Sequence, residues 1–119
     1  MANDWVALFA TAQGLVERAG LDRDALRHGL LHLGRTALLR VALLPAQAPA
    51  LAGLTVAVQR GDVATVGSHL RAVAAQPAGA RLHAAASIVL AQALSDSGAL
   101  DAATAAGVVG VCGAALRRT

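Results

Sequence analysis

The chain has 119 residues, the length of one domain, and a chain of this size can bury roughly two thirds of the surface that its unfolded form exposes. It is 56% hydrophobic, mostly through Ala, Leu and Val, with Trp5 and Phe9 as the two aromatic residues. The formal net charge of +3 comes from ten arginines against seven acids, and the single cysteine excludes an internal disulfide. Ala and Leu favour helices, whereas strands prefer aromatic and β-branched side chains, so we predict an all-α fold.

The N-terminal part predicts two helices. The first begins near Asn3, a good N-cap residue, and ends at Gly20, which suits the left-handed position that commonly closes a helix. The second begins at Asp22 and ends before Pro45. It is more than 20 residues long, and its two glycines are candidate points for a bend or an interruption.

A loop over residues 45–61 follows, because this segment contains two prolines and two glycines; its TVAVQ stretch is a candidate for a short strand. Asp62 then caps a third helix that runs to about Ala75. A fourth helix starts at about Ala80, after a break at Gln76-Pro77, and ends near Ser95.

A fifth helix is capped by Asp101 and holds Arg117 and Arg118 in its last turn, where positive charge favours the helix dipole. These elements predict a compact bundle of about five helices. We expect residues 1–119 to form one helical domain.

Charge and hydropathy also limit the partners. The arginines are interspersed with acids and lack the stacking aromatics of nucleic-acid-binding surfaces, so we expect no nucleic acid, with an arginine-rich binder of duplex DNA or acidic ligands as a rival reading. No stretch has the roughly 20 apolar residues of a membrane span, and the acidic start, MANDWVALFA, lacks the positive charge of a signal peptide. We therefore expect no membrane association and a cytoplasmic protein. The large apolar content predicts a covered face, and a homodimer is the expected partner.

Few residues suggest catalysis or metal binding. His28 and His32 share a helix face, but no acid at matching spacing supplies a third ligand, so we predict no metal site. The segment GVVGVCG repeats glycine every three residues without matching a dinucleotide fingerprint. We interpret it as a smooth helix surface, either in the core or across a two-fold interface, with Cys112 as an inert apolar side chain.

The tripeptide Arg60-Gly61-Asp62 has a local explanation. Glycine releases the backbone from the preceding segment, Asp62 accepts the first helical amides, and Arg60 is left on the turn. A guanidinium held beside a rigid turn suits a carboxylate or phosphate ligand, although a solvated arginine is the commoner outcome.

Residues 55–70, TVAVQRGDVATVGSHL, carry a resemblance to a known family. They resemble the signature Thr-Gly-Pro-x-x-Arg-Gly-Asp-x-x-Thr-Val-x-x-His-Leu of an uncharacterised helical domain. That domain follows a Rossmann-like nucleotide-binding domain in NAD(P)-dependent oxidoreductases and is similar to the C-terminal domains of 6-phosphogluconate dehydrogenase and ketopantoate reductase. The likeness extends over about residues 1–95. It departs at Val56-Ala57, which replace Gly-Pro, and at His83, which replaces a tyrosine.

The resemblance implies a 6-phosphogluconate-dehydrogenase-like helical fold and a role beside a cofactor domain. Asn3 matches an asparagine that would orient the substrate near the hydride, and Thr55, Arg60 and His69 match the signature, Arg60 as a ligand for a small acidic substrate. No catalytic residue is assigned within this chain beyond Asn3 as a candidate. NAD or NADP is implied for the full-length relative, whereas this chain lacks the βαβ unit that holds a pyrophosphate and should bind no cofactor alone.

The sequence therefore predicts the C-terminal helical domain of an NAD(P)-dependent oxidoreductase, which mediates dimerisation and forms one wall of a substrate cleft. The Rossmann-like half would lie upstream of residue 1, or the chain is a shortened relative that lost it. The alternative is a non-enzymatic helical scaffold that kept the fold without the chemistry.

Overall fold

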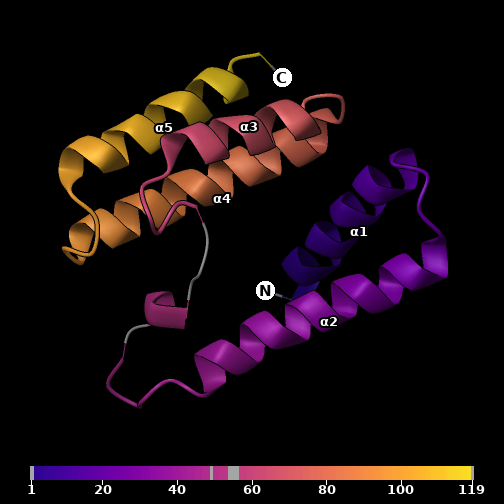
Figure 1. Ribbon diagram of the computed structural model, residues 1–119, viewed down its shortest axis with the longest axis horizontal. Coiled ribbons are helices and arrows are strands. Elements are labelled where there is room, and N and C mark those ends of the chain that lie inside the picture. Colours follow the sequence, from indigo (N-terminus) through magenta and orange to yellow (C-terminus); the bar gives the residue numbers. More distant parts are fainter. Residues whose placement is uncertain (1, 49, 54–56, 119) are drawn as a thin grey trace. The chain divides into compact units, whose positions relative to one another are not determined.

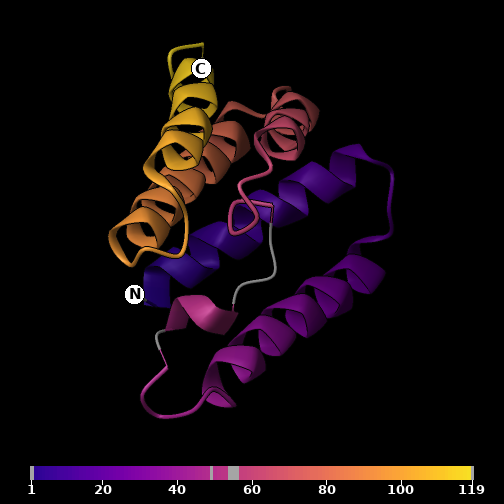
Figure 2. The same cartoon turned by 60° about the vertical axis from the view of Figure 1, so that its left-hand side comes forward.

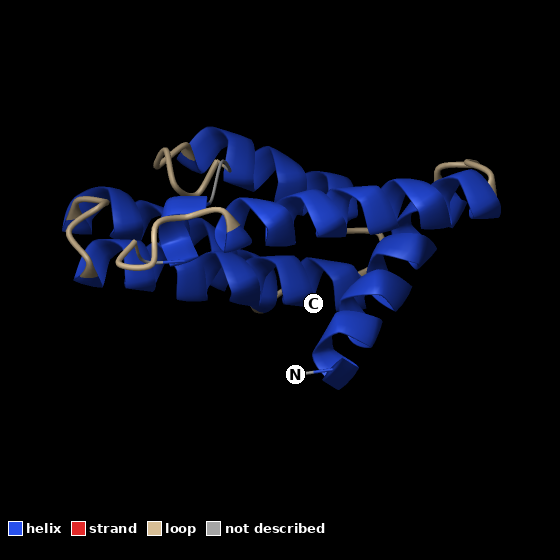
Figure 3. Cartoon of the chain, turned by 90° about the horizontal axis from the view of Figure 1, so that it is seen from below, coloured by secondary structure: helices blue, strands red, loops and turns tan. Residues whose placement is uncertain are grey.

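The structure, a computed structural model, describes residues 2–48, 50–53 and 57–118, with side chains from residue 6 onward in these ranges. Five α-helices and one 3₁₀ helix account for most of this part of the chain, and no strand occurs in it (Figure 3). The elements in chain order are α1 (Ala2–Arg18), α2 (Arg23–Ala42), η1 (Ala50–Gly53), α3 (Val63–Val73), α4 (Pro77–Asp96) and α5 (Ala102–Leu116), as labelled in Figure 1. The prediction of an all-α fold with five helices is confirmed.

The chain divides into two compact units. Met1–Leu54 contains α1, α2 and η1, and Thr55–Thr119 contains α3, α4 and α5.

Aspartates start three of the helices, as the sequence predicts. The Asp22 carboxylate accepts hydrogen bonds from the amides of Asp24 at 3.0 Å and Ala25 at 2.9 Å. Asp101 accepts one from the amide of Thr104 at 2.8 Å, and Asp62 does the same for α3. Each bond satisfies an amide that has no partner inside its helix, which fixes where the helix begins.

Several predicted boundaries are wrong for local reasons. Helix α1 already includes Asn3, so this residue is not the N-cap. Helix α4 begins at Pro77 rather than near Ala80, because a proline at the first helical position loses no hydrogen bond. Helix α5 ends at Leu116, which places Arg117 at the C-cap.

The glycines of α2 do not interrupt it, and the described residues just before α3 form no strand. Helix α2 is continuous through Gly29 and Gly34, and Phe9 of α1 packs beside Gly34, where an added Cβ would lie 3.6 Å from the ring. Residues 57–60 form a turn, and Thr55 and Val56 lie outside the described residues.

The second unit is organised around a seam of small side chains between α4 and α5. Figures 1 and 2 both show α3, α4 and α5 side by side. Apart from Gly79, the buried residues of α4 recur at alternating spacings of four and three, which is the pattern of two helices that interlock along their length. These residues are Ala80, Ala84, Ser87, Ala91 and Leu94. Ala105, Val108 and Cys112 face them from α5. Because most of these side chains are small, the two backbones can approach closely.

The first unit has a much smaller buried core. Leu26 is its one buried residue among those whose side chains are described. Many large apolar side chains of α1 and α2 are exposed, including Leu31 at 64%, Leu33 at 66% and Leu38 at 53%. An apolar surface of this extent is typical of a face that another molecule or another part of a protein covers.

The glycines of α5 provide a test of this packing. Gly110 has open space where a Cβ would lie, whereas a Cβ on Gly107 would approach Val63 Cγ2 to 3.2 Å. We expect Gly110→Ala to raise the free energy of unfolding by about 0.5–1 kcal/mol, because alanine restricts the unfolded chain and favours the helix. Gly107→Ala should give less or no gain, because the methyl group must displace Val63. Urea denaturation followed by circular dichroism measures both, and an equal gain in the two variants would contradict the packing described.

Candidate functional site

The candidate site is the turn that precedes α3, together with the face of α3 that continues from it. Backbone hydrogen bonds close this turn: the Gly61 amide donates to the Val58 carbonyl at 3.0 Å, and the Asp62 amide donates to the Ala57 carbonyl at 3.0 Å. Ala57 and Val58 are buried and anchor the turn in the second unit. The exposed Arg60 is therefore carried on a fixed backbone rather than on a loose loop.

Gly61 is required by both its conformation and its surroundings. Its φ of +66° lies in the left-handed region that side chains rarely adopt. A Cβ here would also collide with the Thr104 side chain of α5. The turn is thus fitted closely against the start of α5.

Asp62 and Thr65 together form the start of α3. The Asp62 carboxylate accepts a hydrogen bond from the Thr65 amide at 2.9 Å and another from the Thr65 hydroxyl at 2.6 Å. These bonds are the main reason why the pKa of Asp62 is lowered, and the charges of Arg60 and His69 lower it further. Asp62 therefore caps α3, as the sequence predicts, and Thr65 holds its carboxylate in place.

His69 lies next to a second histidine that the spacing of the sequence does not reveal. His83 of α4 faces it, with the two ring centroids 5.8 Å apart and the ring planes inclined by 56°. His69 is exposed and His83 is half-buried. Burial lowers the pKa of His83, and the charge of His69 lowers it further, because a second positive charge nearby disfavours protonation.

Two buried polar atoms in this unit have no hydrogen-bond partner among the described residues: His83 Nε2 and Gln76 Oε1. Such atoms are uncommon inside proteins, since each lacks the hydrogen bonds that water would supply. The signal for His83 in the sequence was its position, where the resembling family has a tyrosine. Its proximity to His69 depends on the packing of α3 on α4.

The site provides binding groups but no nucleophile with an adjacent base. Arg60 offers a guanidinium, and His69 and His83 offer ring nitrogens. The Ser68 hydroxyl donates to the Ala64 carbonyl at 3.1 Å, and the buried Ser87 hydrogen-bonds to the Cys112 thiol. Neither serine is thus engaged by a histidine in a catalytic arrangement, and the groups present suit recognition of an anion.

The other two residues implied by the resemblance are not placed at this site. Asn3 belongs to α1 in the first unit, and its side chain lies outside the described part of the structure. Thr55 also lies outside the described residues. The structure therefore brings together Arg60, Asp62, His69 and His83 and leaves the two remaining assignments as predictions.

Within the described ranges, no three His, Cys, Asp or Glu side chains gather closely enough to hold a metal ion. His28 and His32 are both exposed, and His28 Nδ1 lies 2.8 Å from the carbonyl oxygen of Asp24. None of the described helices is long and apolar enough to cross a membrane.

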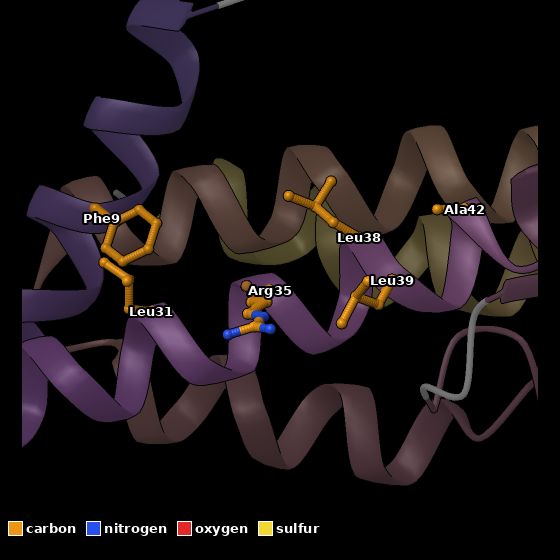
Figure 4. Close-up of a pocket in the computed structure, with 7 residues that line it drawn as sticks. Phe9, Leu31, Arg35, Leu38, Leu39 and Ala42 are labelled. Atoms are coloured by element: carbon orange, nitrogen blue, oxygen red, sulfur yellow. The ribbon is translucent and has the colours of Figure 1, made fainter.

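A separate open hollow lies in the first unit, beside α2. Its volume is about 400 Å³. Phe9 of α1 and Leu31 lie at one end, and Leu38, Leu39 and Ala42 lie at the other (Figure 4). Arg35 is the one charged residue that lines it, and the rest of the lining is apolar.

Comparison with models of known families, with curated proteins and with solved structures gives no match to this chain.

The lowered pKa of His83 predicts a pH dependence of stability. The unfolded state, with a histidine pKa near 6.5, binds more protons than the folded state at slightly acidic pH. The contribution of neutral His83 to the free energy of unfolding is therefore fully present above about pH 6.5. It declines as the pH falls toward the pKa of His83 in the folded state, which is lower. We expect the urea concentration at the unfolding midpoint to decrease as the pH is lowered from about 7.5 to about 5, the range in which histidine titrates. The decrease should be smaller in His83→Phe.

His28→Gln is the matched control, since His28 is exposed on α2. This variant should keep the pH dependence of the unmodified protein. Hydrogen bonds from Thr65 and Thr104 lower the pKa values of Asp62 and Asp101, so these carboxylates stay ionised in the folded protein throughout this window. A His83→Phe profile parallel to that of the unmodified protein would contradict the assignment.

Proposed function

We propose that this chain is the helical, substrate-side domain of an NAD(P)-dependent oxidoreductase and that Arg60 binds an acidic group of the substrate. In this proposal a Rossmann-like domain supplies the cofactor, and the helical domain supplies one wall of the cleft and the dimer contact. The chain alone is not catalytic. The same proposal assigns the chain the fold of the C-terminal domain of 6-phosphogluconate dehydrogenase; the all-helical architecture supports this assignment.

The observation that carries the proposal is the closed turn that holds the backbone of Arg60, with His69 on the helix that follows. The tripeptide forms a closed turn, which the backbone hydrogen bonds of Gly61 and Asp62 hold. The exposed guanidinium is a planar fork of donors that matches a carboxylate or a phosphate. The half-buried His83 stays neutral more readily than an ordinary histidine, so it can accept or donate one hydrogen bond without adding charge.

The reading frame upstream of residue 1 provides the direct test. If it encodes a strand, a glycine-rich turn and a helix, the longer protein should bind NADH or NADPH, as measured by the change in nicotinamide fluorescence. Arg60→Gln in that protein should leave cofactor binding unchanged. It should weaken the binding of a small acidic substrate by roughly tenfold or more, because a charge-assisted hydrogen bond is lost.

Pyruvate is a suitable first probe of the acid site on the chain itself, by NMR titration of the labelled protein. Arg27→Gln is the matched control, because it removes the same charge from exposed α2. Failure of the longer protein to bind either nicotinamide cofactor would overturn the oxidoreductase proposal. Equal effects of the two arginine variants would overturn the role of Arg60.

A second candidate function is a non-enzymatic interaction module. The observation that favours it is the exposed apolar surface of α2 beside the hollow in Figure 4, which a second copy of the chain would cover in a homodimer. The dimer is common to both candidates, so its loss would weaken both. Cofactor binding by the longer protein separates them.

We expect the chain to sediment as a dimer at micromolar concentration. Leu38→Glu should weaken the dimer at least tenfold, because it places a carboxylate on the covered apolar face. Leu21→Glu is the control: Leu21 is also exposed, at 62%, but it lies in the turn between α1 and α2 and outside the hollow. A monomer at high micromolar concentration, or equal weakening by both variants, would contradict dimerisation through this face.

A further inference from the structure

A hollow of about 310 Å³ lies at the opposite end of α3 from the Arg60 turn. Leu70, Ala80 and Val111 form its floor, one residue from each helix of the second unit. Leu70 and Ala80 are buried, so the floor is fixed by the core. The volume is within the range of small-molecule sites, which is roughly 300–1,000 Å³.

The charged residues at the rim of this hollow are both arginines. Arg71 approaches it from the last turn of α3, and Arg118 approaches it from just beyond α5. No acid lines the hollow. Two guanidinium groups that share one apolar hollow repel each other, and an anion placed between them removes that repulsion.

Arg71 is held in position rather than left loose. Its Nη2 donates a hydrogen bond to the Ser68 hydroxyl oxygen at 2.8 Å. The Ser68 hydroxyl in turn donates to the Ala64 carbonyl one turn earlier in the same helix. A guanidinium carries five N–H donors, so this one bond leaves others for a ligand.

The start of α4 borders the hollow, which α3 and α5 reach with their C-terminal ends, where Arg71 and Arg118 offset the partial negative charge of the carbonyl groups. Ala80, in the first turns of α4, lines the hollow, and the N-cap residue Gln76 makes no side-chain capping bond. The first amides of this 20-residue helix therefore lack the side-chain acceptor that Asp62 and Asp101 give to α3 and α5. The N-terminal end of a helix carries partial positive charge, which favours an anion nearby.

We propose that this hollow binds a small organic anion. Its phosphate or carboxylate group lies between Arg71 and Arg118, and its apolar body covers Leu70 and Val111. The site is distinct from the Arg60 turn and does not rest on the oxidoreductase proposal. The arginines at the two helix ends favour the helix dipoles in any case, so the experiment must separate a ligand site from simple end charges.

The test is an NMR titration of the whole ¹⁵N-labelled chain with four probes. Phenyl phosphate carries a dianion and an apolar ring, benzoate carries a carboxylate and the same kind of ring, inorganic phosphate lacks the ring, and benzyl alcohol lacks the charge. We expect phenyl phosphate or benzoate to shift the amides around Leu70, Ala80 and Val111. Either should bind at least tenfold more tightly than inorganic phosphate or benzyl alcohol. The stronger of the two ring-bearing probes identifies the anionic group.

Neighbouring arginines provide matched variants. Arg71→Gln and Arg118→Gln should each weaken binding by about tenfold, because each removes a charge-assisted hydrogen bond. Arg117→Gln removes the same charge one residue away, and Arg117 does not line the hollow, so it should change binding by less than about twofold. The three residues are exposed, and circular dichroism checks that each variant keeps its helices.

Three results would overturn the proposal. One is the absence of shifts around the hollow at millimolar phenyl phosphate and benzoate. Another is equal binding of benzyl alcohol, which would indicate an apolar surface without anion recognition. The third is an equal effect of Arg117→Gln and Arg118→Gln, which would indicate diffuse electrostatic attraction rather than a site.

Discussion

The close packing of α4 on α5 is the constraint on which the second unit depends. Ala84, Ala91 and Val108 are completely buried, and their small volume lets the two backbones approach along most of their length. Helix α3 then lies beside this pair, and the turn before it fits against Thr104 through Gly61. A larger side chain in the seam would separate the helices and displace both the Arg60 turn and the hollow at the far end of α3. The positions of the functional groups therefore follow from alanine and glycine rather than from charged residues.

The sequence predicted those parts of the fold that depend on local chemistry. Asp22, Asp62 and Asp101 cap helices because a short carboxylate accepts nearby amides, and this preference is independent of tertiary structure. The start of α4 was predicted late because the Gln76-Pro77 pair was interpreted as a break, although proline suits the first turn. The contact of His69 with His83 could not be predicted, because it joins residues fourteen positions apart on different helices. The separation into two units likewise depends on which apolar faces meet. A helix that is apolar on nearly all sides, such as α5, does not indicate which of its faces will be buried.

The two ends of α3 have different chemical characters. At its start, the Asp62 carboxylate is satisfied by Thr65 and lies near Arg60, and the pair of His69 and His83 lies farther along the helix. At its end, two arginines border an apolar floor without an acid among the lining residues. The first end is the one that the family resemblance connects with a substrate, and the second has no counterpart in that resemblance. One short helix of 11 residues thus positions both candidate binding regions.

The burial of Cys112 has a practical consequence. Its side chain is completely inaccessible, it hydrogen-bonds to Ser87, and burial raises the pKa of the thiol. Thiolate is the reactive form, so an alkylating reagent can modify this residue only after α4 and α5 separate. Because it is the one cysteine in the chain, the rate of its alkylation in native buffer would report how often the helical pair opens. The protein thus contains an internal probe of its own fluctuations, without an introduced label.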